Sequence, residues 1–188
     1  PVRFVCSRAS VGAVLGSCIR RLIGARVGAG VMVADDRRTS PAILEDETIE
    51  IKSRNRITEK YGEQANIGVT SYNRFILLTG QAPTNEIKQD VSVLVLEVPN
   101  VRNVQNEIVV GSSSSATTHA TDALLTSRVK GRIAQNKDVG ANHVKVISED
   151  RTVFLLGLVT RAEGESASQT AAPTTDPPRV LTVFQNLD

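Results

Sequence analysis

The stretch Val69–Pro83 reads VTSYNRFILLTGQAP, with two apolar runs on either side of Asn73-Arg74. Alternation of apolar and polar residues before this pair predicts a strand over residues 67–72. The more apolar run after it predicts a second strand over 75–79, which we expect to stop at Gly80. Strands that are joined by so short a turn must be antiparallel. The stretch therefore predicts a β-hairpin.

The residues on either side of this hairpin complete a unit of five elements. The charged segment Glu45–Tyr61 predicts an amphipathic helix. Its inward face is marked by three residues spaced four apart, which are Ile49, Ser53 and Ile57. After the hairpin, Thr84 is a predicted N-cap for a helix over 86–98, and a third strand is expected over 101–110. The order is helix–strand–strand–helix–strand.

The same order returns after a Gly/Ser/Thr-rich segment that we expect to be a flexible linker. Asp122–Lys137 predicts a helix, with Leu125, Val129 and Ile133 placed as Ile49, Ser53 and Ile57 are in the first copy. The remaining elements of this copy are strands over 143–148, 152–156 (ended by Gly157) and 179–185. Each copy predicts a three-stranded mixed sheet packed on two helices, which is an α+β fold. Units of about 70 residues bury little surface, so we expect them to pack on one another through helices or sheets.

The second copy departs from the first where its second helix should be. Residues 164–178 read GESASQTAAPTTDPP and contain Pro173, Pro177 and Pro178. A proline inside a helix destabilises it by about 3 kcal/mol. We therefore expect this helix to be short, broken or replaced by a loop.

The N-terminal segment differs in charge from the rest of the chain. Residues 1–44 carry seven Arg and two Asp, whereas residues 45–188 carry three more acids than bases. The uncharged run Ala9–Ile19 has the length of a signal-peptide core. It contains Leu15-Gly16-Ser17-Cys18, which predicts a lipobox with acylation of Cys18; a small-residue loop is the alternative interpretation. The resulting division is a signal peptide (1–17), a lipidated tether (18–44), a first domain (45–111), a linker (112–120) and a second domain (121–188).

Several classes of function find no support in the sequence. His119 and His143 are its two histidines, and neither belongs to a metal or nucleophile motif. Cys6 and Cys18 are its two cysteines, too few for a disulfide framework or a four-cysteine zinc site. A GXXG loop is absent between the helices and there are six aromatic residues, which argues against nucleic-acid binding. We therefore expect neither an enzyme nor a metal or cofactor.

The predicted helix Asp122–Lys137 has a net charge of +3 in an otherwise acidic region. A face beside its apolar stripe is formed by Leu124, Arg128, Gly131 and Arg132, with Ser127 and Gln135 at its margin. An exposed leucine among cations and small residues suits an anionic phospholipid surface, where Leu124 would enter the acyl boundary and the arginines would meet phosphates. Lys130 lies on the far side. An ordinary solvated face and a docking face for a protein partner or another copy are the alternatives.

The repeated motifs resemble the BON domain, in VTSYNRFILLTGQAP of the first copy and in DALLTSRVKGRI and HVKVISEDRTVFLLGLVTR of the second. Two copies behind a lipobox cysteine resemble the dual-BON outer-membrane lipoproteins. The resemblance implies a non-enzymatic protein that faces the periplasm, is anchored by lipid on Cys18 and maintains outer-membrane integrity. It also implies association with the outer-membrane protein assembly machinery. In that family the first helix of the second domain binds anionic phospholipid of the phosphatidylglycerol type, and the resemblance implies lipid contacts here at Leu124, Ser127, Arg128, Gly131 and Arg132. An aromatic residue in place of Leu124 could anchor better at a membrane interface, so we expect a modest affinity for lipid.

Overall fold

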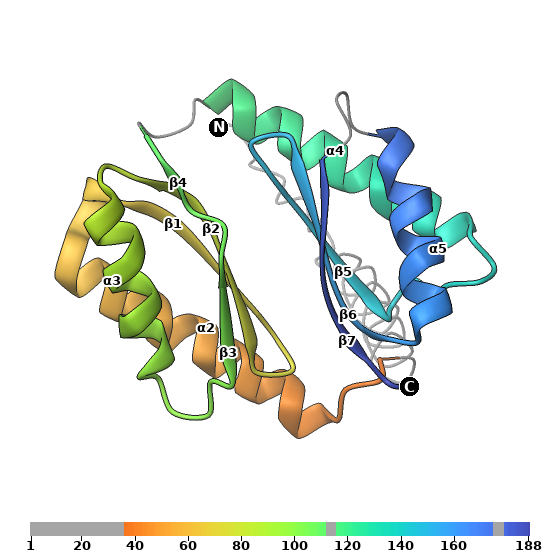
Figure 1. Cartoon of the computed structure of the whole chain (residues 1–188), viewed down its shortest axis with the longest axis horizontal. Helices are drawn as coiled ribbons and strands as arrows, with labels where there is room; N and C mark the ends of the chain where they lie inside the picture. Colours follow the sequence, from red (N-terminus) through yellow and green to blue (C-terminus); the bar gives the residue numbers. More distant parts are fainter. Residues whose placement is uncertain (1–35, 112–115, 175–178) are drawn as a thin grey trace, which may run out of the picture. The chain divides into compact units, whose positions relative to one another are not determined.

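The computed structural model describes residues 36–111, 116–174 and 179–188, which belong to one compact unit, Asp35–Asp188. Within this part of the chain the predicted five-element unit occurs twice (Figure 1). The predicted signal peptide, Cys18 and most of the predicted tether lie outside the described residues.

The first repeat contains a mixed sheet in the order β1-β2-β3, in which β4 also pairs with β2. Its elements are α2 (Ser40–Tyr61), η1 (Gly62–Gln64), β1 (Asn66–Tyr72), β2 (Phe75–Ala82), α3 (Asn85–Leu96), β3 (Asn103–Asn106) and β4 (Val109–Val110). β1 and β2 are antiparallel, as their short turn requires, and β3 and β4 run parallel to β2 after the crossover through α3.

The second repeat has the same topology, with the sheet order β5-β6-β7. Its elements are α4 (Ala116–Gln135), β5 (Val144–Glu149), β6 (Thr152–Val159), α5 (Arg161–Ala171), η2 (Ala172–Thr174) and β7 (Val180–Asn186). β5 and β6 are antiparallel, and β7 pairs with β6 in parallel. The predicted α+β fold class and the repeat are confirmed.

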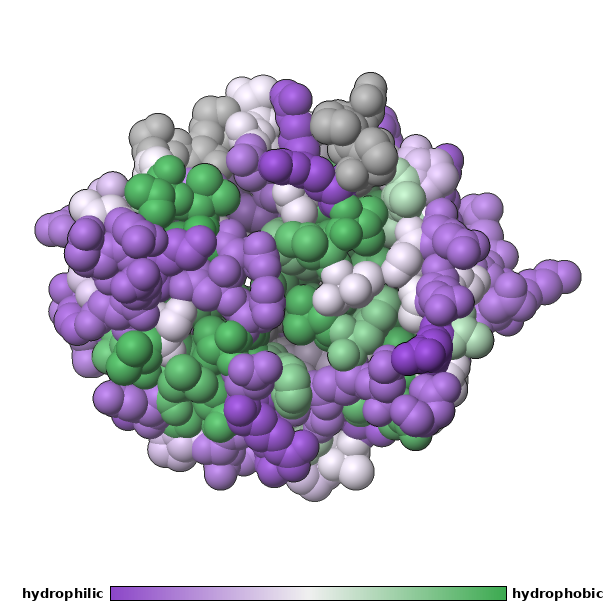
Figure 2. All heavy atoms as spheres, in the orientation of Figure 1, coloured by the Kyte–Doolittle hydropathy of each residue, from purple (hydrophilic) through white to green (hydrophobic). Residues whose placement is uncertain are grey.

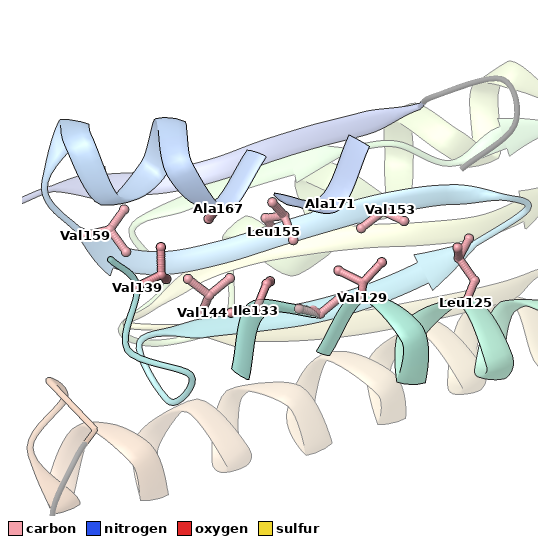
Figure 3. Packing of buried hydrophobic residues seen from close by; sticks show 11 residues of the cluster. Leu125, Val129, Ile133, Val139, Val144, Val153, Leu155, Val159, Ala167 and Ala171 are labelled. Carbon is pink, nitrogen blue, oxygen red and sulfur yellow. The ribbon is translucent and has the colours of Figure 1, made fainter. Parts of the chain in front are cut away.

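Each repeat has its own core between its helices and one face of its sheet. In the second repeat, Leu125, Val129 and Ile133 of α4 meet Val153 and Leu155 of β6 (Figure 3). The equivalent cluster in the first repeat includes Ile49, Ile57, Ile76 and Leu78. The predicted inward stripes of both first helices are thus buried.

The opposite faces of the two sheets share a third apolar cluster. Tyr72 and Leu77 of the first repeat pack with Phe154 and Leu156 of the second. This contact buries the second face of the central strands, which explains why β2 and β6 are apolar along almost their whole length. The two copies therefore pack through their sheets.

The hairpin glycines do not end their strands as predicted, because β2 continues to Ala82 and β6 to Val159. Gly80 has a φ of 98°, and a Cβ there would lie 2.1 Å from the carbonyl oxygen of Asn66. A Cβ at Gly157 would lie 2.6 Å from the carbonyl oxygen of His143. Glycine is required at both places by the close approach of the neighbouring strand, and it leaves the ladder intact.

The first helix of each repeat begins earlier than predicted. α2 begins at Ser40 because Thr39 caps it and Pro41 lies in its first turn, where proline is tolerated. α4 begins at Ala116, inside the segment predicted as linker, and ends at Gln135. There the Thr121 hydroxyl donates a hydrogen bond of 2.9 Å to the carbonyl oxygen of Thr117, one turn back along the helix.

The strand predicted over 101–110 is divided into β3 and β4. The side-chain amide of Asn106 donates to the carbonyl oxygen of Lys88 at 2.7 Å, and its Oδ1 accepts from the backbone of Ile108 at 3.0 Å. This bend turns Ile108 into the core, where it is 1% exposed. The interruption therefore adds an apolar contact that an unbroken strand would lose.

The second helix of the second repeat is short and intact rather than broken. α5 is eleven residues long and ends before Pro173, which lies in η2. Thr160 and Glu163 form a capping box at its start, and Ala167 and Ala171 bury its inward face. Pro177 and Pro178 lie outside the described residues.

Candidate functional site

The outer face of α4 carries every residue predicted as a lipid contact. Because Leu125, Val129 and Ile133 face the core, the helix turns its other sides to solvent. Leu124 is 61% exposed. The other members, Ser127, Arg128, Gly131 and Arg132, are also exposed. The structure thus brings the five residues together on one accessible surface, which we call the α4 outer face.

The cations of α4 have no acidic partner in the part of the chain that the structure describes. Arg128, Lys130 and Arg132 are exposed and none forms an ion pair there. A shallow depression beside them is lined by Arg128, Gly131, Arg132, Gln135, Pro173 and Thr174. Gly131 leaves open space there, since a Cβ would meet nothing within 4 Å. The α4 outer face can therefore approach a flat anionic surface with its charges free.

Sequence reasoning missed the part that Pro173 and Thr174 of η2 play in this depression. From the sequence, Pro173 was considered only as a helix breaker, and no role was predicted for Thr174. Because η2 follows α5 directly, it lies beside the C-terminal half of α4. Helix periodicity on α4 could not reveal a contribution from a segment about 40 residues away in the sequence.

A buried acid in each first helix was also missed as a structural determinant. Asp122 is 4% exposed and accepts backbone hydrogen bonds of 2.9 Å from Asp150 and Arg151, both of which have positive φ. Asp46 makes the equivalent contacts in the first repeat, with Asn73 and Arg74. Each acid ties the N-terminal part of its helix to the turn of the following hairpin. The recurrence of Asp at repeat-related positions was the signal available in the sequence.

The segment before α2 is fixed against both repeats. Arg37 binds Glu163 through two hydrogen bonds of 2.7 Å and donates to the carbonyl oxygen of Leu158 at 2.9 Å. Its guanidinium group lowers the pKa of Glu163 to about 2. Arg38 pairs with Asp36 and Asp46. The chain therefore enters the described unit at the ends of β6 and α5.

The two histidines lie in different parts of the second repeat. His119 is exposed on α4. His143 is partly buried, with its Nδ1 3.6 Å from Oε1 of Glu163. In residues 36–111, 116–174 and 179–188, no group of three or more His, Cys, Asp or Glu residues is placed to hold a metal ion. Among the same residues, no helix has both the length and the apolar content that crossing a bilayer needs.

Comparison with known proteins identifies the repeated unit. The model of the BON domain matches residues 45–112 and 121–183. The chain is 34% identical over 176 residues to the outer membrane lipoprotein DolP of Haemophilus influenzae, covering 93% of this chain and 91% of that protein. It is 30% identical over 138 residues to the 21 kDa hemolysin of Actinobacillus pleuropneumoniae, covering 72% and 71% of the two chains.

Among solved structures, one match is the C-terminal domain of CdsD, the structural protein of the type III secretion system of Chlamydia trachomatis. The alignment covers 80% of this chain and all of that domain, at 10% identity and a TM-score of 0.30. The family model, in contrast, matches both repeats and more than half of the sequence. The chain therefore belongs to the BON-domain family, with one BON domain in each repeat.

Proposed function

We propose that this protein is an outer-membrane lipoprotein whose second BON domain binds anionic phospholipid through the α4 outer face. The observation that carries the proposal is the exposure of Leu124 on the same face as Arg128 and Arg132, neither of which forms an ion pair with a described residue. Similarity over 93% of the chain to a protein named as an outer membrane lipoprotein supports the location. The predicted lipid on Cys18 would hold the domain close to the membrane.

The chemistry of the α4 outer face matches the layers of a membrane surface. Leu124 is long enough to enter the boundary between headgroups and acyl chains. Arg128 and Arg132 would contact lipid phosphates, each contributing about 1 kcal/mol near an anionic surface. Gly131 has no side chain, so it would let the helix backbone approach the headgroups. Ser127 would contribute a hydroxyl group at the margin of the contact.

The physiological role that follows is maintenance of the outer membrane without catalysis. A lipid anchor and one small lipid-binding face would keep the molecule on anionic regions of the periplasmic leaflet. From there it would reach the outer-membrane protein assembly machinery, which we propose as a protein partner. Intact mass spectrometry of protein from the envelope tests the anchor, since cleavage before Cys18 and acylation change the mass together.

The binding proposal is tested by sedimentation of the full chain with vesicles. We expect binding to vesicles that contain phosphatidylglycerol and much weaker binding to phosphatidylcholine alone. Arg128→Glu with Arg132→Glu should reduce the apparent affinity at least tenfold, because about 1 kcal/mol is lost for each removed cation before any repulsion is counted. Binding by purified protein also separates this function from that of a protein scaffold, which would need its partner.

A matched control changes the same charge on the first repeat. Lys52→Glu with Arg102→Glu alters two exposed cations that form no ion pair within the described residues. This variant should retain most of the binding, since only the long-range field of the molecule is altered. Equal losses in both variants, or equal binding to neutral and anionic vesicles, would refute the assignment to α4.

A further inference from the structure

The sheet of the second BON domain ends at β7, which has a strand on one side only in the described part of the chain. The parallel ladder to β6 uses alternate residues of β7, as shown by the hydrogen bonds from Val153 N to Arg179 O (2.8 Å) and from Leu187 N to Val159 O (3.2 Å). The residues between them direct their backbone N–H and C=O groups to the other side. These residues are Val180, Thr182, Phe184 and Asn186. β7 therefore offers a row of donors and acceptors that have no backbone partner among the described residues.

This edge lacks the features that usually protect a terminal strand. Exposed edges are commonly blocked by charged residues, proline or a bulge. The seven residues of β7 read VLTVFQN and contain none of these residue types. Leu181 is 42% exposed and Thr182 is also exposed. Figure 2 shows the surface over β7 as green to white, in contrast to the purple residues around it.

A groove lies at this open edge, between β7 and α5. It is lined by Arg161, Gly164, Glu165, Ser168 and Gln169 from α5 and by Thr182, Phe184 and Asn186 from β7. Gly164 lets the helix lie close to the strand, because a Cβ there would be 3.1 Å from the ring of Phe184. The residues of β7 that line the groove are the ones whose backbone groups point away from β6 to the open edge.

We infer that β7 accepts an extended segment of another polypeptide as an added strand, with α5 as the wall of its groove. Strand addition pairs the backbone of the segment with the edge and places alternate side chains of the segment against the helix. Those side chains would meet the Phe184 ring, the Ser168 hydroxyl and the opposite charges of Arg161 and Glu165. Gly164 brings α5 close to β7, and the opposite charges of Arg161 and Glu165 favour neither sign, so the ligand class is an extended segment with short, uncharged side chains, such as Thr or Val, facing α5.

A single strand fits this surface better than a second copy of the chain. A stable interface between folded proteins buries about 800 Å² on each partner. β7 presents four residues and one shallow groove, a smaller surface than that. The proposed site is also separate from the lipid face, which lies on α4, so it goes beyond the lipid-binding function and does not depend on it.

The proposal is tested with the full chain and a synthetic peptide, acetyl-TVTVTVT-amide, followed by amide hydrogen exchange. Bound peptide should slow exchange at Thr182, Phe184 and Asn186 and leave the β5–β6 hairpin unchanged. A peptide that is N-methylated at the alternate residues facing β7 should bind at least about tenfold more weakly, because it loses several backbone hydrogen bonds. Equal binding of the two peptides, or no protection of β7 at millimolar concentration, would overturn the proposal.

Two substitutions at one position separate backbone pairing from side-chain effects. Thr182→Pro removes an N–H that faces the open edge, where proline is tolerated, and should weaken peptide binding about tenfold. Thr182→Val keeps the N–H and should bind as the parent does. Unchanged exchange in the β5–β6 hairpin verifies that each variant is folded. A dimer of the full chain that Thr182→Pro dissociates would identify a second copy as the occupant and contradict the inference.

Discussion

The first helices of the two BON domains, α2 and α4, share their inward sides and differ on their outward sides. Both bury apolar or small residues four positions apart, and both use a buried Asp to hold the next turn. Outside this shared set, α2 has four acids and four bases, whereas α4 has no acid and three bases. The fold therefore constrains one side of the helix and leaves the other free to differ.

The cations of α2 are mostly engaged within the molecule. Arg54 pairs with Glu50, Arg56 donates to the carbonyl oxygen of Leu94, and Lys60 pairs with Asp90. Those of α4 form no ion pair in the described part of the chain. A cation that already has a protein partner gains less from a phosphate, since it must give up one contact for the other. The difference between the repeats thus favours α4 as the lipid-binding helix.

The largest effect that we expect from this comparison concerns the buried acids. Asp46 accepts four hydrogen bonds, from Ser71, Asn73, Arg74 and Arg38, at 2.7 to 3.0 Å. Asp46→Ala should lower the free energy of unfolding of the first repeat by about 4 kcal/mol, because it leaves the Ser71 hydroxyl and two backbone N–H groups without their acceptor and removes one of the two carboxylates that pair with Arg38.

The same change in the second repeat should be milder. Asp122 accepts two hydrogen bonds, both from the backbone, and no cation contacts it within the described residues. Asp122→Ala should lower the free energy of unfolding of the second repeat by about 2 kcal/mol. Amide exchange of the β1–β2 and β5–β6 hairpins measures each repeat separately. Asp138→Ala, at an exposed acid, is the control. Equal destabilisation by the two buried changes would show that the extra contacts of Asp46, with Arg38 and Ser71, contribute nothing.

The sequence predicts the buried faces of the first helices better than it predicts where these helices begin. The spacing of Ile49, Ser53 and Ile57, and of its copy, predicts both buried helix faces correctly, because burial imposes the helical period on sequence. The limits of the helices were less predictable. Thr39 and the threonines near Ala116 are polar, and polar composition alone does not separate a linker from a capped or solvated helical turn.

The strand limits were missed because they depend on tertiary contacts. From the sequence alone, Gly80 and Gly157 look like strand ends. In the structure each must be glycine because the carbonyl oxygen of an adjacent strand lies where its Cβ would be. The α4 outer face was predictable, since its residues are close in sequence and follow one helical period. The groove on β7 was not, because it combines α5 with an edge that exists only once the sheet order is known.

A smaller effect is expected when one residue is exchanged between the outward faces. Thr48 of α2 is the repeat equivalent of Leu124 of α4. The two positions are 76 residues apart, as are Asp46 and Asp122. Leu124→Thr should weaken binding to phosphatidylglycerol vesicles about threefold to tenfold, because part of the burial of a leucine side chain is lost. Since Leu124 is exposed, stability should change by less than about 0.5 kcal/mol.

The reciprocal change, Thr48→Leu, should leave vesicle binding as it is. The acids Glu45 and Glu47 lie near it on α2, so an added leucine there would remain beside negative charge. Vesicle sedimentation compares the two variants directly. A gain of binding in Thr48→Leu equal to the loss in Leu124→Thr would mean that exposed apolar area, rather than the cationic setting of α4, governs the contact.

The smallest effect concerns the second helices, α3 and α5, which are capped alike by Thr84 and Thr160. The third position of α3 is Ile87, whereas that of α5 is Glu163, whose pKa is lowered to about 2 first of all by its hydrogen bonds with Arg37. A lowered carboxyl pKa gives stability that is complete above the ordinary value near 4.5 and is lost as the pH falls towards about 2. Acid should therefore loosen the start of α5 over this interval.

Arg37→Gln should weaken that pH dependence, since it returns the Glu163 pKa towards its ordinary value. The measurement is amide exchange of α5 at pH 5 and pH 3, and an unaltered pH dependence in Arg37→Gln would show that the capping box alone holds the carboxylate.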